Sequence, residues 1–248
     1  MVKEKLVYKR PASLRDTPFS YCPGCGHSTV HKLIAEIVDE LNLRENIIAV
    51  SPVGCAVFGY FFWNFDVTEA AHGRTPVVAT AIKRVLPDRI VFSYQGDGDL
   101  ASIGLSEILH TANRGENITV IFINNTNYGM TGGQMAPTTL VNQVTTTSPA
   151  GRDTANYGYP MRVIEMLAAF EGVKYLERVK VTNAASVIKT KKALKKAFLN
   201  QIENVGFSMV EILTTCPANW RKEPRDANKW VDEVVSKYYP LGKIKDIT

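Results

Sequence analysis

Two short segments of the chain contain residue types that bind metal ions and phosphate groups. The first is Gln95-Gly96-Asp97-Gly98-Asp99, and the second is Asn124-Asn125-Thr126-Asn127-Tyr128-Gly129. The glycines beside Asp97 allow the backbone to approach an anion closely, and a helix that starts there directs its free N–H groups at the anion. Magnesium takes oxygen ligands, which a carboxylate, an amide oxygen and a backbone carbonyl can supply. The two segments therefore predict a diphosphate site with a bound Mg²⁺.

Four cysteines form a second candidate site: Cys22, Cys25, Cys55 and Cys216. Four thiolates can hold a [4Fe–4S] cluster, a [2Fe–2S] cluster or a structural zinc ion, and the Cys-x-x-Cys spacing of Cys22 and Cys25 suits all three. A redox-active Cys-x-x-Cys pair is a further alternative, but it leaves Cys55 and Cys216 without a role. Disulfides are rare in a reducing cytosol, so metal binding or catalysis is the favoured interpretation.

Strand-like and helix-like segments alternate along the chain. Apolar runs predict strands at residues 47–50, 89–94, 118–123, 175–181 and 208–213. Apolar residues at helical spacing predict helices at residues 27–41, 76–86, 101–114, 161–170 and 184–204. This alternation predicts an α/β fold, a mostly parallel sheet with helices on both faces. Both oxygen-rich segments follow predicted strands, at the carboxyl ends where ligands bind in such sheets.

Composition and charge set the broad class of the protein. Hydrophobic residues make up 45% and charged residues 21% of the sequence, which is typical of a globular protein. The formal net charge of +5 is too small to indicate nucleic-acid binding. No apolar run approaches the roughly 20 residues of a membrane helix, so no membrane association is expected. The first ten residues lack the apolar stretch of a secretory signal, and a cytoplasmic location is expected.

The spacing of the two oxygen-rich segments resembles the fingerprint of thiamine diphosphate enzymes. In that fingerprint a pair of asparagines follows GDG, and here Asn125 lies 28 residues after Asp97. The resemblance implies that Asp97 and Asn125 bind the Mg²⁺ through their side chains and that Asn127 binds it through its carbonyl. It also implies cofactor contacts from Gly96, Gly98, Asp99, Gly129 and Met130.

The motifs taken together resemble the beta subunit of 2-oxoacid:ferredoxin oxidoreductases. They are CPGCGH at 22–27, Gly-Cys at 54–55, HGR at 72–74, NYGMTGGQMAPTT at 127–139 and Cys-Pro at 216–217. The resemblance implies the thiamine diphosphate-binding fold, one [4Fe–4S] cluster on Cys22, Cys25, Cys55 and Cys216, and cofactor contacts from Val53, Gly54, Cys55, Ala56 and His72. The expected domains are an N-terminal arm at 1–20, a thiamine diphosphate and iron–sulfur domain at 21–220, and a C-terminal helix and tail at 221–248.

The resemblance also implies a reaction and its partners. The reaction is the oxidative decarboxylation of a 2-oxoacid to acyl-coenzyme A and CO₂, with electrons passed through the cluster to ferredoxin. In that family the alpha subunit supplies the glutamate that activates the thiamine, and the sequence offers no convincing substitute. The chain alone is therefore expected to be inactive. Its expected partner is an alpha subunit, with gamma and delta subunits as further candidates.

An aromatic run after Cys55 bears on the choice of 2-oxoacid. It comprises Phe58, Tyr60, Phe61, Phe62, Trp63 and Phe65, which form either core and subunit contacts or an apolar wall of the substrate pocket. No lysine or arginine lies between Cys55 and Arg74, whereas a second substrate carboxylate would need a cation. This pattern favours branched-chain 2-oxoacids such as 2-ketoisovalerate over 2-oxoglutarate.

Two other functions fit parts of the sequence. One is a non-oxidative thiamine diphosphate decarboxylase or synthase whose four cysteines hold a structural zinc ion. The other is a zinc-stapled domain that contacts nucleic acid through the lysine-rich segment 189–196, although GDG and NN then have no role. That segment is otherwise expected to be a solvated helix face or a docking patch for ferredoxin. His27 and His31 are expected to be surface or packed residues rather than a metal pair.

Overall fold

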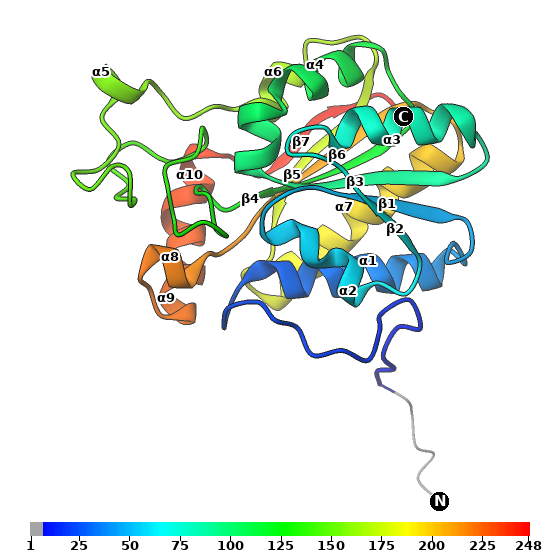
Figure 1. The fold of residues 1–248 in the computed structure, drawn as a ribbon, viewed down its shortest axis with the longest axis horizontal. Helices are drawn as coiled ribbons and strands as arrows, with labels where there is room; N and C mark the ends of the chain where they lie inside the picture. The colour runs from blue at the N-terminus through cyan, green and yellow to red at the C-terminus, as the bar shows by residue number, and fades with distance from the viewer. Residues whose placement is uncertain (1–6) are drawn as a thin grey trace, which may run out of the picture.

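The computed structural model describes residues 7–248, which form a seven-stranded sheet with helices on both faces (Figure 1). The strand order is β2-β1-β3-β4-β6-β5-β7. All neighbouring strands are parallel except β5 and β7, which are antiparallel. The predicted fold class is confirmed. The predictions for residues 1–6, the start of the arm and the absence of a secretory signal there, lie outside the described residues.

The central strands are the apolar runs of the sequence. In β3 (Ile90–Gly96) every residue but the last is buried, and β4 (Thr119–Asn124) is buried throughout. The remaining strands are β1 (Ile47–Ser51), β2 (Asp66–Glu69), β5 (Val173–Lys180), β6 (Phe207–Leu213) and β7 (Gly242–Asp246). The two strands that the sequence did not predict, β2 and β7, are the edges of the sheet.

Helices cover the two faces of the sheet in separate groups (Figure 1). One face packs against α1 (Gly26–Glu40), α2 (Gly59–Phe62) and α7 (Ala184–Ile202), and the other against α3 (Thr75–Val85), α4 (Leu105–Asn113) and α6 (Val163–Leu167). Successive side chains of a strand point to opposite faces. Accordingly, Phe92 and Tyr94 of β3 enter the first core and Val91 enters the second.

Short elements surround the carboxyl edge of the sheet. They are the 3₁₀ turn η1 (Cys55–Phe58), the π-helical turn η2 (Asp99–Ile103), α5 (Thr154–Tyr157), α8 (Pro217–Trp220), α9 (Pro224–Trp230), the π-helical turn η3 (Val231–Val235) and α10 (Ser236–Tyr238). The C-terminal elements form a small apolar cluster in which Val231, Val235 and Tyr239 pack against Leu213, the last residue of β6. The chain then returns to the sheet as β7.

Polar contacts fasten the arm and the lysine-rich segment to α1. The backbone N–H and the hydroxyl of Ser13 both donate to Asp39. From α7, Lys191 pairs with Glu36 and Glu40 at 2.6 and 2.7 Å. These ion pairs fit a solvated helix face that holds α7 on α1. None of the helices within residues 7–248 is both long and apolar enough to cross a membrane.

Candidate functional site

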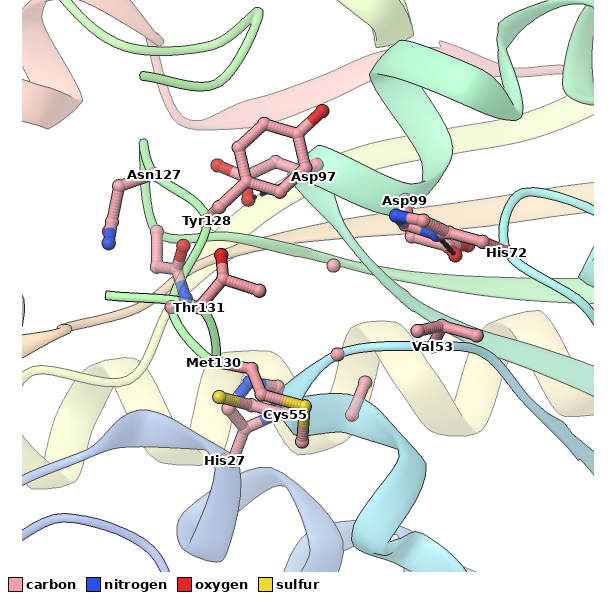
Figure 2. Close-up of a pocket in the computed structure, with 16 residues that line it drawn as sticks. His27, Val53, Cys55, His72, Asp97, Asp99, Asn127, Tyr128, Met130 and Thr131 are labelled. Atoms are coloured by element: carbon pink, nitrogen blue, oxygen red, sulfur yellow. Dashed lines mark hydrogen bonds and ion pairs between the residues drawn. The ribbon is translucent and has the colours of Figure 1, made fainter. Parts of the chain in front are cut away.

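An open cavity lies where β1, β3 and β4 end (Figure 2). Its volume is about 150 Å³. The loop after β1 contributes residues 53–56, the loop after β3 contributes 96–99, and the loop after β4 contributes Asn125 and 127–131. With His72, these loops bring together every residue predicted to bind the diphosphate cofactor or its magnesium ion. Their contacts with a ligand remain predictions.

Three oxygen atoms converge in this cavity at the ends of β3 and β4. The side-chain oxygen of Asn125 lies 2.8 Å from the carbonyl oxygen of Asn127 and 3.2 Å from Oδ1 of Asp97. Oxygens this close repel one another unless a proton or a cation lies between them. Rotating the amide by 180° would make its NH₂ group a donor to both oxygens. Alternatively, an octahedral Mg²⁺ fits, because its neighbouring ligands are about 3 Å apart when each lies about 2.1 Å from the ion.

The carboxylate of Asp97 is buried and held from two sides. The hydroxyl of Thr138 donates to Oδ2 at 2.5 Å, and the backbone N–H of Gly98 donates to Oδ1 at 3.0 Å. Burial raises the pKa of Asp97 to about 7, although these hydrogen bonds oppose the shift. A nearby cation would favour the ionised carboxylate, so the environment of Asp97 suits a metal ligand.

A second buried carboxylate, Asp99, orients His72. Oδ1 of Asp99 pairs with Nδ1 of His72 and accepts the backbone N–H of Gly73 at 2.9 Å, and Oδ2 accepts the side-chain amide of Gln95 at 2.6 Å. Figure 2 marks the His72–Asp99 pair with a dashed line on the wall formed by the loop after β3. Asp99 is therefore fully engaged within the protein, and His72 presents its ring to the cavity in a fixed orientation.

The four cysteines gather beside this cavity from three parts of the fold. Cys22 and Cys25 precede α1, Cys55 begins η1, and Cys216 precedes α8. The hydroxyl of Thr215 donates to the carbonyl of Gly24 at 2.6 Å and joins the first segment to the last. Gly129, which lines the cavity, adjoins two of the sulfurs: a Cβ atom there would lie 3.3 Å from Sγ of Cys55 and 3.7 Å from Sγ of Cys216.

Burial raises the pKa of Cys25, Cys55 and Cys216 and keeps these three thiols neutral when no metal is bound. It raises the pKa of Cys25 to about 12, and the nearby sulfurs of Cys216, Cys55 and Cys22 raise it further. Burial likewise raises the pKa of Cys55 to about 11. Cys25 has Cys216 and Cys55 as neighbours in addition to Cys22, so a redox-active pair of Cys22 and Cys25 alone does not account for the arrangement. Binding to a metal would offset the unfavourable free energy of burying the thiolates.

Comparison with known proteins agrees with this geometry. Residues 54–212 match the family described as thiamine pyrophosphate enzyme, C-terminal TPP binding domain; thiamine pyrophosphate is another name for thiamine diphosphate. The chain is 36% identical, over 93% of its length, to the 2-oxoglutarate synthase subunit KorB of Methanocaldococcus jannaschii, and the match covers 82% of that protein. The chain belongs to the 2-oxoacid:ferredoxin oxidoreductase family.

Other members of this oxidoreductase family are similar over most of the chain. Identity is 44%, over 98% of the chain, with the ketoisovalerate oxidoreductase subunit VorA of Methanothermobacter thermautotrophicus. The chain spans about half the length of that relative, 53%. The solved 2-oxoglutarate:ferredoxin oxidoreductase of Magnetococcus marinus superposes with a TM-score of 0.74 and 28% identity, over 86% of this chain and 69% of that chain.

The match to the thiamine pyrophosphate domain includes only part of the candidate site. Asp97, Asn125 and Asn127 lie within the matched residues, and so does Cys55. Cys22 and Cys216 lie outside them, as does Cys25. The comparison therefore supports thiamine pyrophosphate binding in this oxidoreductase family member directly. It does not address a magnesium ion or a cluster.

Several cavity residues were not predicted. They are His27, Tyr128 and Thr131. His27 is packed, as expected, but it also lines the cavity, where its Nδ1 lies 2.7 Å from the Tyr94 hydroxyl and burial lowers its pKa to about 4. Tyr128 and Thr131 belong to the NYGMTGGQ string itself, so their position in that motif was the available signal.

The aromatic run after Cys55 does not form a wall of the cavity. None of its six members is among the described residues that line it. Phe62 and Trp63 are buried in the core beside α1, whereas Tyr60 and Phe61 remain exposed on the surface. The run points away from the cavity because η1 and α2 direct it toward α1. Of the two predictions for this run, the one of core and contact residues is therefore correct for Phe62 and Trp63.

Proposed function

We propose that this chain is the beta subunit of a 2-oxoacid:ferredoxin oxidoreductase that converts a 2-oxoacid to acyl-coenzyme A and CO₂. One observation carries the proposal. The three converging oxygens of Asp97, Asn125 and Asn127 and the thiol of Cys55 line the same cavity. This arrangement suits a cofactor whose diphosphate is bound through magnesium and whose electrons leave through an adjacent cluster.

The magnesium ion would bind Oδ1 of Asp97, the side-chain oxygen of Asn125 and the carbonyl oxygen of Asn127. These are the hard oxygen donors that Mg²⁺ prefers, and their spacing suits its octahedral geometry. Bound thiamine diphosphate would supply the carbanion-stabilising ring for decarboxylation. The contribution of the chain is to hold the diphosphate end through the metal, to let the backbone approach it at Gly96 and Gly98, and to present His72 in a fixed orientation.

The four cysteines would hold one [4Fe–4S] cluster, which accepts electrons one at a time. Within residues 7–248, no group of three or more His, Cys, Asp or Glu side chains is arranged to hold a single metal ion. A zinc ion binds sulfur at about 2.3 Å, which would bring its four sulfurs to about 4 Å from one another. A cluster binds each cysteine through a different iron atom and so needs a wider spacing. The similarity of the chain to subunits of 2-oxoacid oxidoreductases favours the cluster over the structural zinc of the alternative enzyme.

A partner chain would complete the active site. The carboxylates that line the cavity within the described residues are Asp97 and Asp99, one facing the proposed metal and the other paired with His72. Neither is free to activate the aminopyrimidine of thiamine diphosphate. We therefore assign the activating glutamate to an alpha subunit, with ferredoxin as the electron acceptor and coenzyme A as the acyl acceptor.

The substrate we propose is a branched-chain 2-oxoacid such as 2-ketoisovalerate. No lysine or arginine lines the described cavity, so no cation of this chain is available for a second substrate carboxylate. Relatives named ketoisovalerate oxidoreductase subunits are 44% and 45% identical to the chain, against 36% for the 2-oxoglutarate synthase subunit of Methanocaldococcus jannaschii.

The test is the rate of ferredoxin reduction by the chain assembled with its partner subunits. We expect coenzyme A-dependent turnover with 2-ketoisovalerate, at least tenfold slower turnover with 2-oxoglutarate, and no turnover from the chain alone. Faster turnover with 2-oxoglutarate would overturn the choice of substrate. Turnover by the isolated chain would overturn the assignment of the glutamate to a partner.

A further inference from the structure

Two side-chain amides converge on the sulfur of Cys216. Nδ2 of Asn219 lies 3.4 Å from Sγ of Cys216, and Nδ2 of Asn127 lies 3.6 Å from the same atom. Among the side chains that the structure describes, no other donates a hydrogen bond to a cysteine sulfur. Cys216 is therefore distinguished from Cys22, Cys25 and Cys55 by two N–H···S hydrogen bonds from side chains.

The surrounding structure fixes both amides in this orientation. The indole N–H of Trp220 donates to Oδ1 of Asn127 at 3.1 Å, which turns the NH₂ group of Asn127 toward the sulfur. Asn219 donates from the same nitrogen to the carbonyl of Gly129 at 2.7 Å. Gly133 packs directly on Asn219, since a Cβ at Gly133 would lie 2.9 Å from that of Asn219. The donors are thus built into the cavity loop and α8.

We propose that Asn127 and Asn219 are positioning residues that raise the reduction potential of the [4Fe–4S] cluster through their hydrogen bonds to Cys216. The inference rests on the proposed cluster. Reduction adds one electron, and no bond forms or breaks in that step. The added negative charge is shared by the sulfur ligands, so N–H dipoles directed at a sulfur stabilise the reduced form more than the oxidised form.

The position of Cys216 gives this effect a functional consequence. Its sulfur and that of Cys55 adjoin Gly129, which lines the cofactor cavity. The two amides therefore act on the side of the cluster that faces the cofactor. A higher reduction potential of the cluster favours transfer of an electron from the cofactor to the cluster. Asn127 would serve both groups, since its carbonyl faces the proposed magnesium ion and its side chain faces the sulfur.

The experiment is a redox titration of the assembled complex, prepared without oxygen and followed by the electron paramagnetic resonance signal of the reduced cluster. Asn219→Leu and Asn127→Leu each remove one N–H···S bond. We expect both variants to have a more negative midpoint potential than the wild type, so that at the wild-type midpoint their clusters are mostly oxidised. Asn219→Asp, which keeps the size of the side chain but loses the N–H donor, should shift in the same direction.

Gln134→Leu is the matched control, because Gln134 bonds to Thr131 within the same loop and does not reach a sulfur. Its midpoint potential should equal that of the wild type. Unchanged potentials in the Asn219 and Asn127 variants, or an equal shift in Gln134→Leu, would overturn the inference. Iron and sulfide content distinguishes the two possible failures. A wild-type chain without a cluster overturns the proposed function, whereas a cluster with unshifted potentials overturns only the role of the amides.

Discussion

The hydroxyl of Thr138 donates a 2.5 Å hydrogen bond to Oδ2 of Asp97, although 41 residues separate them in the chain. This bond leaves Oδ1 of Asp97 directed at Asn125. Thr138 is itself fixed, because its carbonyl accepts the hydroxyl of Tyr239 at 2.8 Å. The long loop after β4 thus returns to the cavity and sets the orientation of the carboxylate.

Thr138→Val tests this orientation. Valine has the shape of threonine but cannot donate, and a hydrogen bond to a charged group contributes about 1.5–3 kcal/mol. We expect magnesium-dependent thiamine diphosphate binding to weaken about tenfold or more, measured by titration calorimetry. Thr138→Ser keeps the hydroxyl and should bind like the wild type. Equal affinity in the valine variant would show that the hydrogen bond does not orient the ligand.

Asp97→Asn tests the magnesium site itself. The amide preserves the size of the side chain but removes the negative charge that attracts a divalent cation. We therefore expect thiamine diphosphate binding to lose its dependence on magnesium and its affinity to fall at least a hundredfold. The measurement is the dissociation constant with and without Mg²⁺. Asp88→Asn, at an exposed aspartate before β3, is the control and should retain wild-type affinity. Retained magnesium dependence in Asp97→Asn would remove Asp97 from the metal site.

A buried ion-pair network contacts Asn124, the last residue of β4. Arg178 donates to Glu211 at 2.7 Å and to Glu165 at 2.6 Å, and Glu211 also accepts the side chain of Asn124 at 2.7 Å. Arg178 and Glu211 are each only 1% exposed. Removing one member of such a pair leaves a buried charge without its partner, which is strongly destabilising.

Arg178→Met should therefore lower the free energy of unfolding by about 3–5 kcal/mol, measured by urea denaturation. The double variant Arg178→Met/Glu211→Leu removes both charges and should regain most of that loss. Lys192→Met, at an exposed position of α7, should stay within about 0.5 kcal/mol of the wild type. A double variant no more stable than Arg178→Met would mean that the buried charge is not the cause.

The sequence alone predicted the elements that carry the cavity. Apolar runs located β3 and β4, and the motifs at their ends located Asp97 and Asn125. The edge strand β2 was missed because its four residues, DVTE, are partly or fully exposed and show no apolar alternation. The strand β7 was missed for the same reason, since GKIKD has a single apolar side chain. Edge strands are held by backbone pairing to their neighbours, which leaves little trace in residue type.

Contacts between distant segments were the other limit of sequence reasoning. The roles of Thr138 and Asn219 depend on loops that fold back onto the cavity, and no spacing rule connects Thr138 to Asp97 or Asn219 to Cys216. His27 was expected to be packed or exposed. Its place in the cavity follows from the start of α1 at Gly26, immediately after Cys25.

In the proposed enzyme one chain binds one thiamine diphosphate and one [4Fe–4S] cluster at the same cavity. The most direct test of this proposal is to purify the chain with its partner subunits in the absence of oxygen and to quantify iron, acid-labile sulfide, zinc and thiamine diphosphate. Because the partner subunits can carry clusters of their own, Cys216→Ser is measured in parallel. We expect a brown wild-type complex with one thiamine diphosphate per chain, and about four iron and four sulfide atoms fewer per chain in Cys216→Ser. Zinc in place of that iron, or equal iron in both complexes, would contradict the proposal.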